Sequence, residues 1–114
     1  MKQDNYKKGK TGELLAKIYL RLKLYKIVEM NYKGANGEID IIAKKGNTLV
    51  FVEVKYRANL ENGYPREAVN KHKIQKITKT AQHYIASHNI KNTDFRFDVI
   101  EILGKHIEHI KNVF

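Results

Sequence analysis

Four charged side chains interrupt two strand-like segments near the middle of this 114-residue chain. Glu38 and Asp40 lie in an Ile-rich segment, and Glu53 and Lys55 lie in the Val-rich segment that follows it. Carboxylates bind hard divalent cations and exchange protons, whereas a lysine amine can contact a phosphate or orient a water molecule. These groups can act together only where the fold gathers them into one patch.

The dipeptide Gly46-Asn47 predicts a two-residue turn that joins the two segments as an antiparallel hairpin. In the register set by this turn, one face of the hairpin is wholly apolar and belongs in the core. Its cross-strand pairs are Ile39–Val54, Ile41–Val52 and Ala43–Val50. Because side chains alternate between the two faces, Asp40 then lies opposite Glu53, and Glu38 lies opposite Lys55.

An aspartate directly opposite a glutamate destabilises a sheet. At about 5 Å and an effective dielectric of about 20, the repulsion between Asp40 and Glu53 is roughly 3 kcal/mol. A proton held by one carboxyl, or a cation between the two, relieves it. Carboxylate oxygens in a chain without cysteine suit Mg²⁺ or Mn²⁺ better than zinc or copper. A solvated or salt-bridged patch without a ligand is the alternative interpretation.

The elements that position this hairpin are predicted from periodicity and turn signals. Residues 12–26 have helical spacing, residues 27–33 form a strand that ends at the turn GANG, and a second helix starts at Pro65 and ends near His88. Residues 93–103 form another strand, which a turn at Gly104-Lys105 could connect to a last one. The apolar stripe expected on the first helix consists of Leu14, Leu15, Ile18, Leu22 and Tyr25. The predicted fold class is α/β, with a single mixed sheet of four to five strands packed by helices.

Length and composition indicate one folded domain over residues 1–114, with a flexible basic lead-in over residues 1–8. The chain carries 22 lysines and arginines against 12 acidic residues, a formal net charge of +10. Such an excess favours a polyanionic partner, and nucleic acid is favoured over a membrane because no basic amphipathic helix with an aromatic apolar face stands out. Solvated surface lysines are the alternative. The absence of a signal peptide or long apolar run predicts a cytoplasmic protein.

Asp40 followed by Glu53-x-Lys55 resembles the site motif of the PD-(D/E)XK nuclease superfamily. A longer resemblance covers the chain from about Gly12 onward and points to the YraN-like family of small bacterial proteins, which is similar to archaeal Holliday-junction resolvases. The segments that carry it are GELLA, NYKGANGEIDIIA, FVEVKYR, AVNKHK, RFDV and HIKNVF. The resemblance implies a restriction-endonuclease-like (resolvase-like) core.

The resemblance also implies roles for individual residues. Asp40 and Glu53 would be metal ligands, Lys55 the catalytic lysine, and Glu13 a further acid from the first helix. Glu13 lies off the apolar stripe expected on that helix, so complementing the helix dipole is its alternative role. The chain departs from the family pattern at Ile39, where the superfamily has proline, and at Lys33, where arginine is expected; a lysine cannot make the bidentate contact of a guanidinium.

Four basic residues are candidates for contacts with nucleic-acid phosphates. Lys73 and Lys76 lie on the second helix, Arg57 shares the face of Lys55, and Lys33 precedes the first turn. A solvated helix face is the alternative for Lys73 and Lys76, and a salt bridge at the rim is the alternative for Arg57. Glu38 is a candidate supporting residue that would tune the position and the pKa of Lys55.

Together these features predict a metal-dependent endonuclease that hydrolyses phosphodiester bonds in nucleic acid, with branched DNA as a candidate substrate and DNA favoured over RNA. A nucleic-acid-binding protein that has a nuclease fold and little catalysis is the alternative. A structural or interaction domain is a third interpretation. Resolving a four-way junction needs two active sites, so a homodimer is expected if the protein has that activity.

Overall fold

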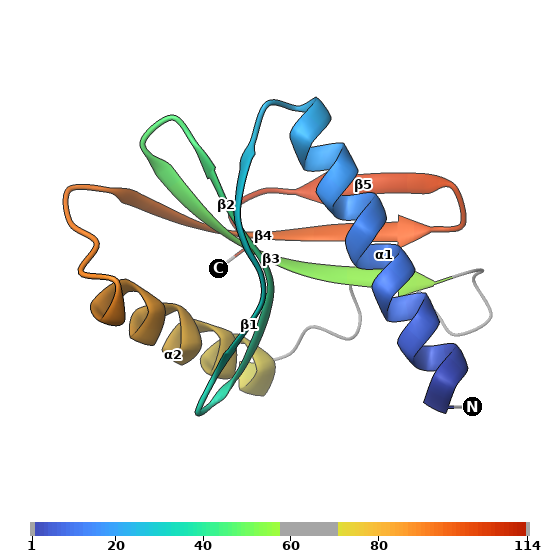
Figure 1. Ribbon diagram of the computed structural model, residues 1–114, viewed down its shortest axis with the longest axis horizontal. Helices are drawn as coiled ribbons and strands as arrows, with labels where there is room; N and C mark the ends of the chain where they lie inside the picture. Colours follow the sequence, from blue (N-terminus) through green and yellow to red (C-terminus); the bar gives the residue numbers. More distant parts are fainter. Residues whose placement is uncertain (1, 58–70, 114) are drawn as a thin grey trace.

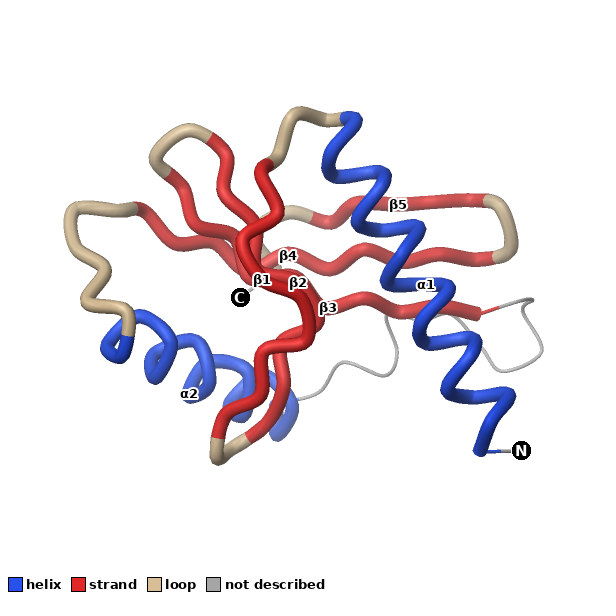
Figure 2. Tube along the Cα trace, in the orientation of Figure 1, coloured by secondary structure: helices blue, strands red, loops and turns tan. Residues whose placement is uncertain are grey.

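The computed structural model describes residues 2–57 and 71–113, and these residues form one sheet of five strands with two helices (Figures 1 and 2). The elements in chain order are α1 (Lys2–Leu22), β1 (Lys26–Gly34), β2 (Gly37–Lys45), β3 (Thr48–Arg57), α2 (Lys71–Ser87), β4 (Asp94–Leu103) and β5 (His106–Ile110). The loop predicted before Pro65 and the start predicted for the second helix lie outside the described residues. The flexibility expected for residues 1–8 stays a prediction.

The strands lie in the sheet in the order in which they occur along the chain. Neighbouring strands are antiparallel except β3 and β4, which are parallel and are separated in the sequence by α2. The predicted fold class is therefore confirmed as α/β with a single mixed sheet, an arrangement compatible with a restriction-endonuclease-like core. Gly46 has a φ of 59° at the predicted turn between β2 and β3, a conformation that costs glycine little.

The two helices cover opposite faces of the sheet. One hydrophobic cluster joins α1 to residues such as Val50 and Val52, and a second joins α2 to Phe51 and Leu49. Consecutive residues of β3 thus belong to different clusters, as the alternation of a strand requires. In Figure 1 α1 and α2 lie apart, with strands of the sheet between them. Neither helix, over the described residues, is long and apolar enough to cross a membrane.

The apolar stripe predicted for α1 is wrong in part. Ala16 and Leu20 of this helix are fully buried, whereas the predicted members Leu14, Ile18 and Leu22 are exposed. Small residues let the helix approach the sheet closely: a Cβ atom on Gly12 would lie 2.7 Å from the Cβ of Tyr56. The position of α1 is thus set by small residues, which a search for large apolar side chains does not find.

The boundaries of α1 also differ from the prediction. The helix begins at Lys2 rather than near Gly12 and ends at Leu22 rather than near Lys26. Its end has a local cause, because Leu24 adopts a left-handed φ of 70° and the Tyr25 amide donates a hydrogen bond to the Leu20 carbonyl.

Strands β2 and β3 separate where the acidic residues begin. Their backbone pairing runs from Lys45–Thr48 to Ile41–Val52, in the predicted register, and the register recorded for these strands extends no further. The predicted pairs beyond that point, including Asp40 with Glu53, are therefore wrong. In place of a ladder bond, the Val54 amide donates a hydrogen bond of 2.8 Å to the Asp40 carboxylate.

A twist in the hairpin of β1 and β2 explains this separation. Ile39 belongs to the α2 cluster whereas Ile41 belongs to the α1 cluster, although residues two apart in a regular strand share a face. At the same level of β1, Asn31 adopts a left-handed φ of 53°. Beyond the twist, Tyr32 packs edge-on against Tyr84 of α2, with 5.0 Å between the ring centroids. Packing against α2 thus draws the tip of the β1–β2 hairpin away from β3. We call the place where β2 and β3 diverge, beyond the pair Ile41–Val52, the fork.

Candidate active site

The fork between β2 and β3 contains a cluster of three carboxylates. One carboxylate oxygen from each of Glu13, Glu38 and Asp40 lies within 4.8 Å of those of the other two. Glu13 comes from α1, and Glu38 and Asp40 come from β2. The resemblance alone gave Glu13 a place here, whereas helical periodicity could not. Glu13 follows Gly12, so the close approach of α1 to the sheet carries its side chain to the edge of the fork.

Glu38 has a different neighbour from the one predicted. The expected pair with Lys55 is wrong, because the β2–β3 register ends at Ile41–Val52 and the Glu38 carboxylate joins the cluster of Glu13 and Asp40 instead. The twist of the hairpin at Asp40 causes this, since it carries residues 37–39 away from β3. Lys33 is exposed on β1.

Burial and mutual repulsion strongly perturb the acid at the centre of the fork. Burial, followed by the negative charges of Glu53, Glu13 and Glu38, raises the pKa of Asp40 to about 7, although the hydrogen bond from the Val54 amide opposes this. Burial also raises the pKa of Glu13, against a hydrogen bond from the Asn31 side chain. A carboxyl whose pKa is raised by other carboxylates is one whose ionised form a bound cation would favour.

Glu53 lies beside this cluster and is held by two lysines. Its Oε1 atom is 3.1 Å from Nζ of Lys55, which projects from the same face of β3, and 2.6 Å from Nζ of Lys73 in the first turn of α2. The contact of Lys73 with phosphate stays a prediction, and without nucleic acid its amine contacts a predicted metal ligand. No sequence signal predicted this contact, because it depends on how the first turn of α2 is placed against β3.

The two amines differ in their affinity for protons. Burial and the neighbouring amine of Lys73 lower the pKa of Lys55, although Glu53 opposes this. Burial alone would lower the pKa of Lys73 as well, but its hydrogen bonds to Glu53 and Lys55 outweigh burial and raise it. Lys73 is therefore the amine that keeps its proton more firmly, and Lys55 is the one that releases it more readily.

The donor set of the fork fits a hard divalent cation. It consists of oxygen atoms from acidic residues on two elements, α1 and β2, and the perturbed pKa of Asp40 marks where negative charge is least compensated. The metal-ligand role of Glu53 stays a prediction, because two ammonium groups contact its Oε1 atom. The carboxylate oxygens do not distinguish between Mg²⁺ and Mn²⁺.

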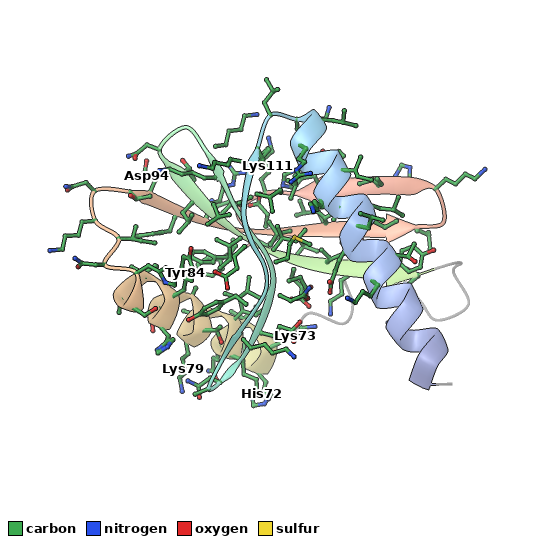
Figure 3. The ribbon with its side chains drawn as sticks, viewed as in Figure 1. His72, Lys73, Lys79, Tyr84, Asp94 and Lys111 are labelled. Carbon is green, nitrogen blue, oxygen red and sulfur yellow. The ribbon has the colours of Figure 1, made fainter. Side chains whose placement is uncertain are left out.

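The other basic candidates lie at different distances from the fork. Lys76 lines a hollow of about 220 Å³ together with Asn36, His72, Gln75 and Lys79, where α2 meets the turn between β1 and β2. Figure 3 shows His72 and Lys79 along the edge of α2 that lies beside the tip of the β1–β2 hairpin, and Lys73 on the opposite side of the first turn of this helix. Arg57 ends β3, and its buried Nε atom has no hydrogen-bond partner within the described part of the chain.

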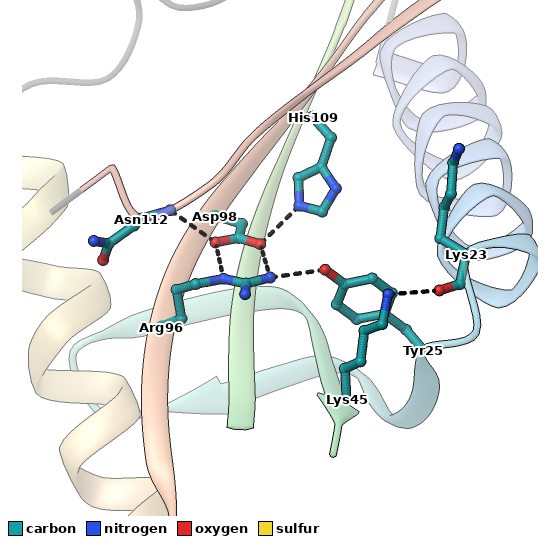
Figure 4. Close-up of polar contacts among 7 residues, drawn as sticks. All are labelled: Lys23, Tyr25, Lys45, Arg96, Asp98, His109 and Asn112. Carbon is teal, nitrogen blue, oxygen red and sulfur yellow. Dashed lines mark hydrogen bonds and ion pairs between the residues drawn. The ribbon is translucent and has the colours of Figure 1, made fainter. Parts of the chain in front are cut away.

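Another buried carboxylate, that of Asp98, forms hydrogen bonds that hold separate parts of the fold together (Figure 4). It accepts hydrogen bonds from Arg96 Nε at 2.9 Å, from His109 Nε2 at 2.7 Å and from the Asn112 amide at 3.0 Å. Burial would raise the pKa of Asp98, but these bonds outweigh it and hold the pKa below its usual value. Arg96 also donates a hydrogen bond of 2.8 Å to the Tyr25 hydroxyl. Asp98 therefore connects β4 to β5 and to the segment after β5, and Arg96 extends this network to Tyr25, just before β1.

Comparison with known proteins finds relatives of similar sequence over nearly the whole chain. A family model described as "Uncharacterised protein family UPF0102" matches residues 12–102. A UPF0102 protein of Clostridioides difficile is 50% identical over 113 residues, which cover 97% of this chain and 99% of the relative. A UPF0102 protein of Persephonella marina is 47% identical over 107 residues, which cover 94% and 92%. One from Caldanaerobacter subterraneus is 50% identical over the full length of both chains.

Proposed function

The chain belongs to the uncharacterised protein family UPF0102. From the geometry of the fork and the resemblance of Asp40, Glu53 and Lys55 to a nuclease motif, we propose that it is a divalent-metal-dependent nuclease. The observation that carries the proposal is the separation of β2 and β3 at Asp40, whose carboxylate takes the place of a backbone partner for Val54. Regular sheet pairing would place this acid directly across from Glu53 on one face of the sheet. The fork instead leaves room for its charge beside Glu53 and Lys55.

The acidic residues would hold the cation. Asp40 and Glu13, with Glu53 as the ligand that the resemblance implies, would bind Mg²⁺ or Mn²⁺, and Glu38 would add negative potential beside them. The bound cation would polarise the scissile phosphate and lower the pKa of water. The protein supplies the rest, because β2 and α1 fix the carboxylates from two sides.

Lys55 would accept the proton that the attacking water loses. Hydrolysis forms one P–O bond and breaks another, so a proton must leave the water and one must reach the departing oxygen. A pKa lowered by burial and by a second amine increases the fraction of Lys55 that is neutral at a given pH, and only the neutral amine can accept the proton of the water. Lys55 is also close enough to Glu53 to be oriented by it, with 3.1 Å between Nζ and Oε1.

The substrate would be nucleic acid, with DNA favoured over RNA and branched DNA as the candidate structure. A net charge of +10 favours phosphate contacts without sequence readout. The hollow with Lys76 and Lys79 offers donors for a backbone phosphate one to two helical turns from Lys73. Arg57 and Lys33 are further candidates at the ends of β3 and β1. Cutting both strands at a junction would require a homodimer.

One observation favours the alternative of a nucleic-acid-binding protein without catalysis. The Glu53 carboxylate is compensated by Lys55 and Lys73 without any cation. A protein that kept this fold only for binding would retain such an ion network for stability.

Cleavage assays distinguish the two functions. The wild type is incubated with four-way junction, flap, duplex and single-stranded DNA and RNA, in Mg²⁺, Mn²⁺ or EDTA. We expect metal-dependent cleavage that Lys55→Ala abolishes while leaving affinity nearly intact, because one lysine contributes little to the phosphate contacts. Lys91→Ala, at an exposed position in the loop after α2, removes the same charge and should cleave like the wild type. Binding without cleavage of any substrate would support the alternative.

A further inference from the structure

A single carboxylate oxygen is shared by two ammonium groups in this site. Oε1 of Glu53 lies 2.6 Å from Nζ of Lys73 and 3.1 Å from Nζ of Lys55. The Glu53 side chain is only 10% exposed, so both contacts are made largely out of water. A buried carboxylate requires such compensation, because removing its partners would leave an unpaired charge.

The two lysines are held very differently. Lys55 lies within β3, which pairs with β4 over its full length, and its side chain is 14% exposed. Lys73 lies in the first turn of α2, and its side chain is 35% exposed. Its four-carbon stem starts on the helix that also lines the hollow with Lys76. Lys73 is therefore the amine that can leave Glu53 without disturbing the sheet.

An ammonium group and a divalent cation compete for the same carboxylate. Lys73 is the more exposed of the two amines and makes the shorter contact, so a cation that approaches Glu53 from solvent is repelled by it. A phosphate placed at the fork reverses this relation, because it offers Lys73 another anionic partner and leaves the Glu53 oxygen to the cation.

We propose that Lys73 is a positioning residue that occupies Glu53 until a phosphate draws it away, so that divalent-cation binding and nucleic-acid binding favour each other. The inference rests on the proposed function, since it takes the cation and the phosphate of that site as its ligands. Coupling between two ligands is reciprocal, so each should raise the affinity of the other by the same factor.

The test measures the affinity for Mn²⁺ by isothermal titration calorimetry, without nucleic acid. Lys73→Met removes the competing charge and keeps the length of the side chain, so it should bind Mn²⁺ about fivefold or more tightly than the wild type. Lys73→Gln keeps a hydrogen-bond donor for Glu53 without the charge and should also bind more tightly. Lys73→Arg keeps the charge and should bind like the wild type. Lys91→Met is the matched control, because it removes a lysine at an exposed position in the loop after α2, outside the proposed site.

A second titration adds a phosphorothioate oligonucleotide that resists hydrolysis. In the wild type it should tighten Mn²⁺ binding, whereas in Lys73→Met the effect of the oligonucleotide should shrink. A purely structural role for Lys73 predicts the opposite sign, since loosening the site would weaken metal binding. Mn²⁺ affinity that is unchanged or lower in both Lys73→Met and Lys73→Gln overturns the inference.

The outcomes separate this inference from the proposed function. Tighter Mn²⁺ binding by Lys73→Met in a protein that cleaves no nucleic acid supports the competition at Glu53 and refutes the nuclease. Metal-dependent cleavage by the wild type with no change of affinity in the variants leaves the nuclease standing and refutes the role of Lys73. If no variant binds Mn²⁺, both are wrong.

Discussion

Replacing Asp40 by asparagine should stabilise the protein at neutral and alkaline pH, although it removes a proposed metal ligand. Burial and three acidic neighbours raise the pKa of Asp40 from 3.8 to about 7. The folded state therefore holds a proton that the unfolded state has already released over this range. The free energy of unfolding must fall as the pH rises through it, because the native state binds more protons than the unfolded one.

The magnitude follows from the two pKa values. At about 1.4 kcal/mol for each pH unit, the interval from 3.8 to about 7 corresponds to about 4 kcal/mol lost by the wild type above pH 7. Asp40→Asn does not titrate, and its amide oxygen can still accept the hydrogen bond from the Val54 amide. The variant should match the wild type near pH 4 and exceed it by up to about 4 kcal/mol near pH 8.

Urea unfolding in EDTA, followed by circular dichroism between about pH 4 and pH 8, measures this difference. Asp94→Asn is the matched control, because it makes the same chemical change at an exposed position at the start of β4. Mn²⁺ should then raise the stability of the wild type and not that of Asp40→Asn, because a ligand stabilises the state that binds it. A difference between Asp40→Asn and wild type that does not vary with pH refutes the buried-charge argument. An equal response to Mn²⁺ in both proteins excludes Asp40 as a ligand.

Two further predictions concern the scaffold. Leu20→Ala, at a fully buried position of α1, should lower the free energy of unfolding by about 2–5 kcal/mol. Leu22→Ala, at a side chain that is 77% exposed, should change it by less than about 0.5 kcal/mol. Equal losses in urea unfolding would contradict the placement of α1. Asp98→Asn should cost about 3 kcal/mol or more at neutral pH by breaking the buried pair with Arg96. Because the pKa of Asp98 is lowered, that loss should shrink as the pH falls below its ordinary value of 3.8, and a loss that persists at low pH would show that the charge is not its cause.

Local patterns predicted the strands well because the alternation of side chains carries the information. The register from Lys45–Thr48 to Ile41–Val52 followed from the turn at Gly46 alone. The stripe of α1 was not predictable in the same way. Large apolar residues mark the buried side of a helix when the helix lies at the usual distance from its sheet. Helix α1 lies closer, with Gly12 and Ala16 against the sheet, and Leu14 and Ile18 therefore point outward.

The site shows a different limit of sequence reasoning. The prediction that Asp40 and Glu53 lie opposite each other assumed a regular hairpin, and regularity fails because Tyr32 and Ile39 are drawn to α2. The carboxylates of Glu13, Glu38 and Asp40 still come together, but they do so in the fork, where β2 and β3 no longer pair.

The same helix that draws the hairpin away carries Lys73 to Glu53. Packing of α2 against the hairpin thus does two things at once: it opens the fork at Asp40 and it supplies the amine that compensates Glu53. A substitution that loosens this packing, such as one at Tyr84, would therefore alter metal affinity without touching any acidic residue. That dependence lies in tertiary packing, which no pairwise spacing in the sequence encodes.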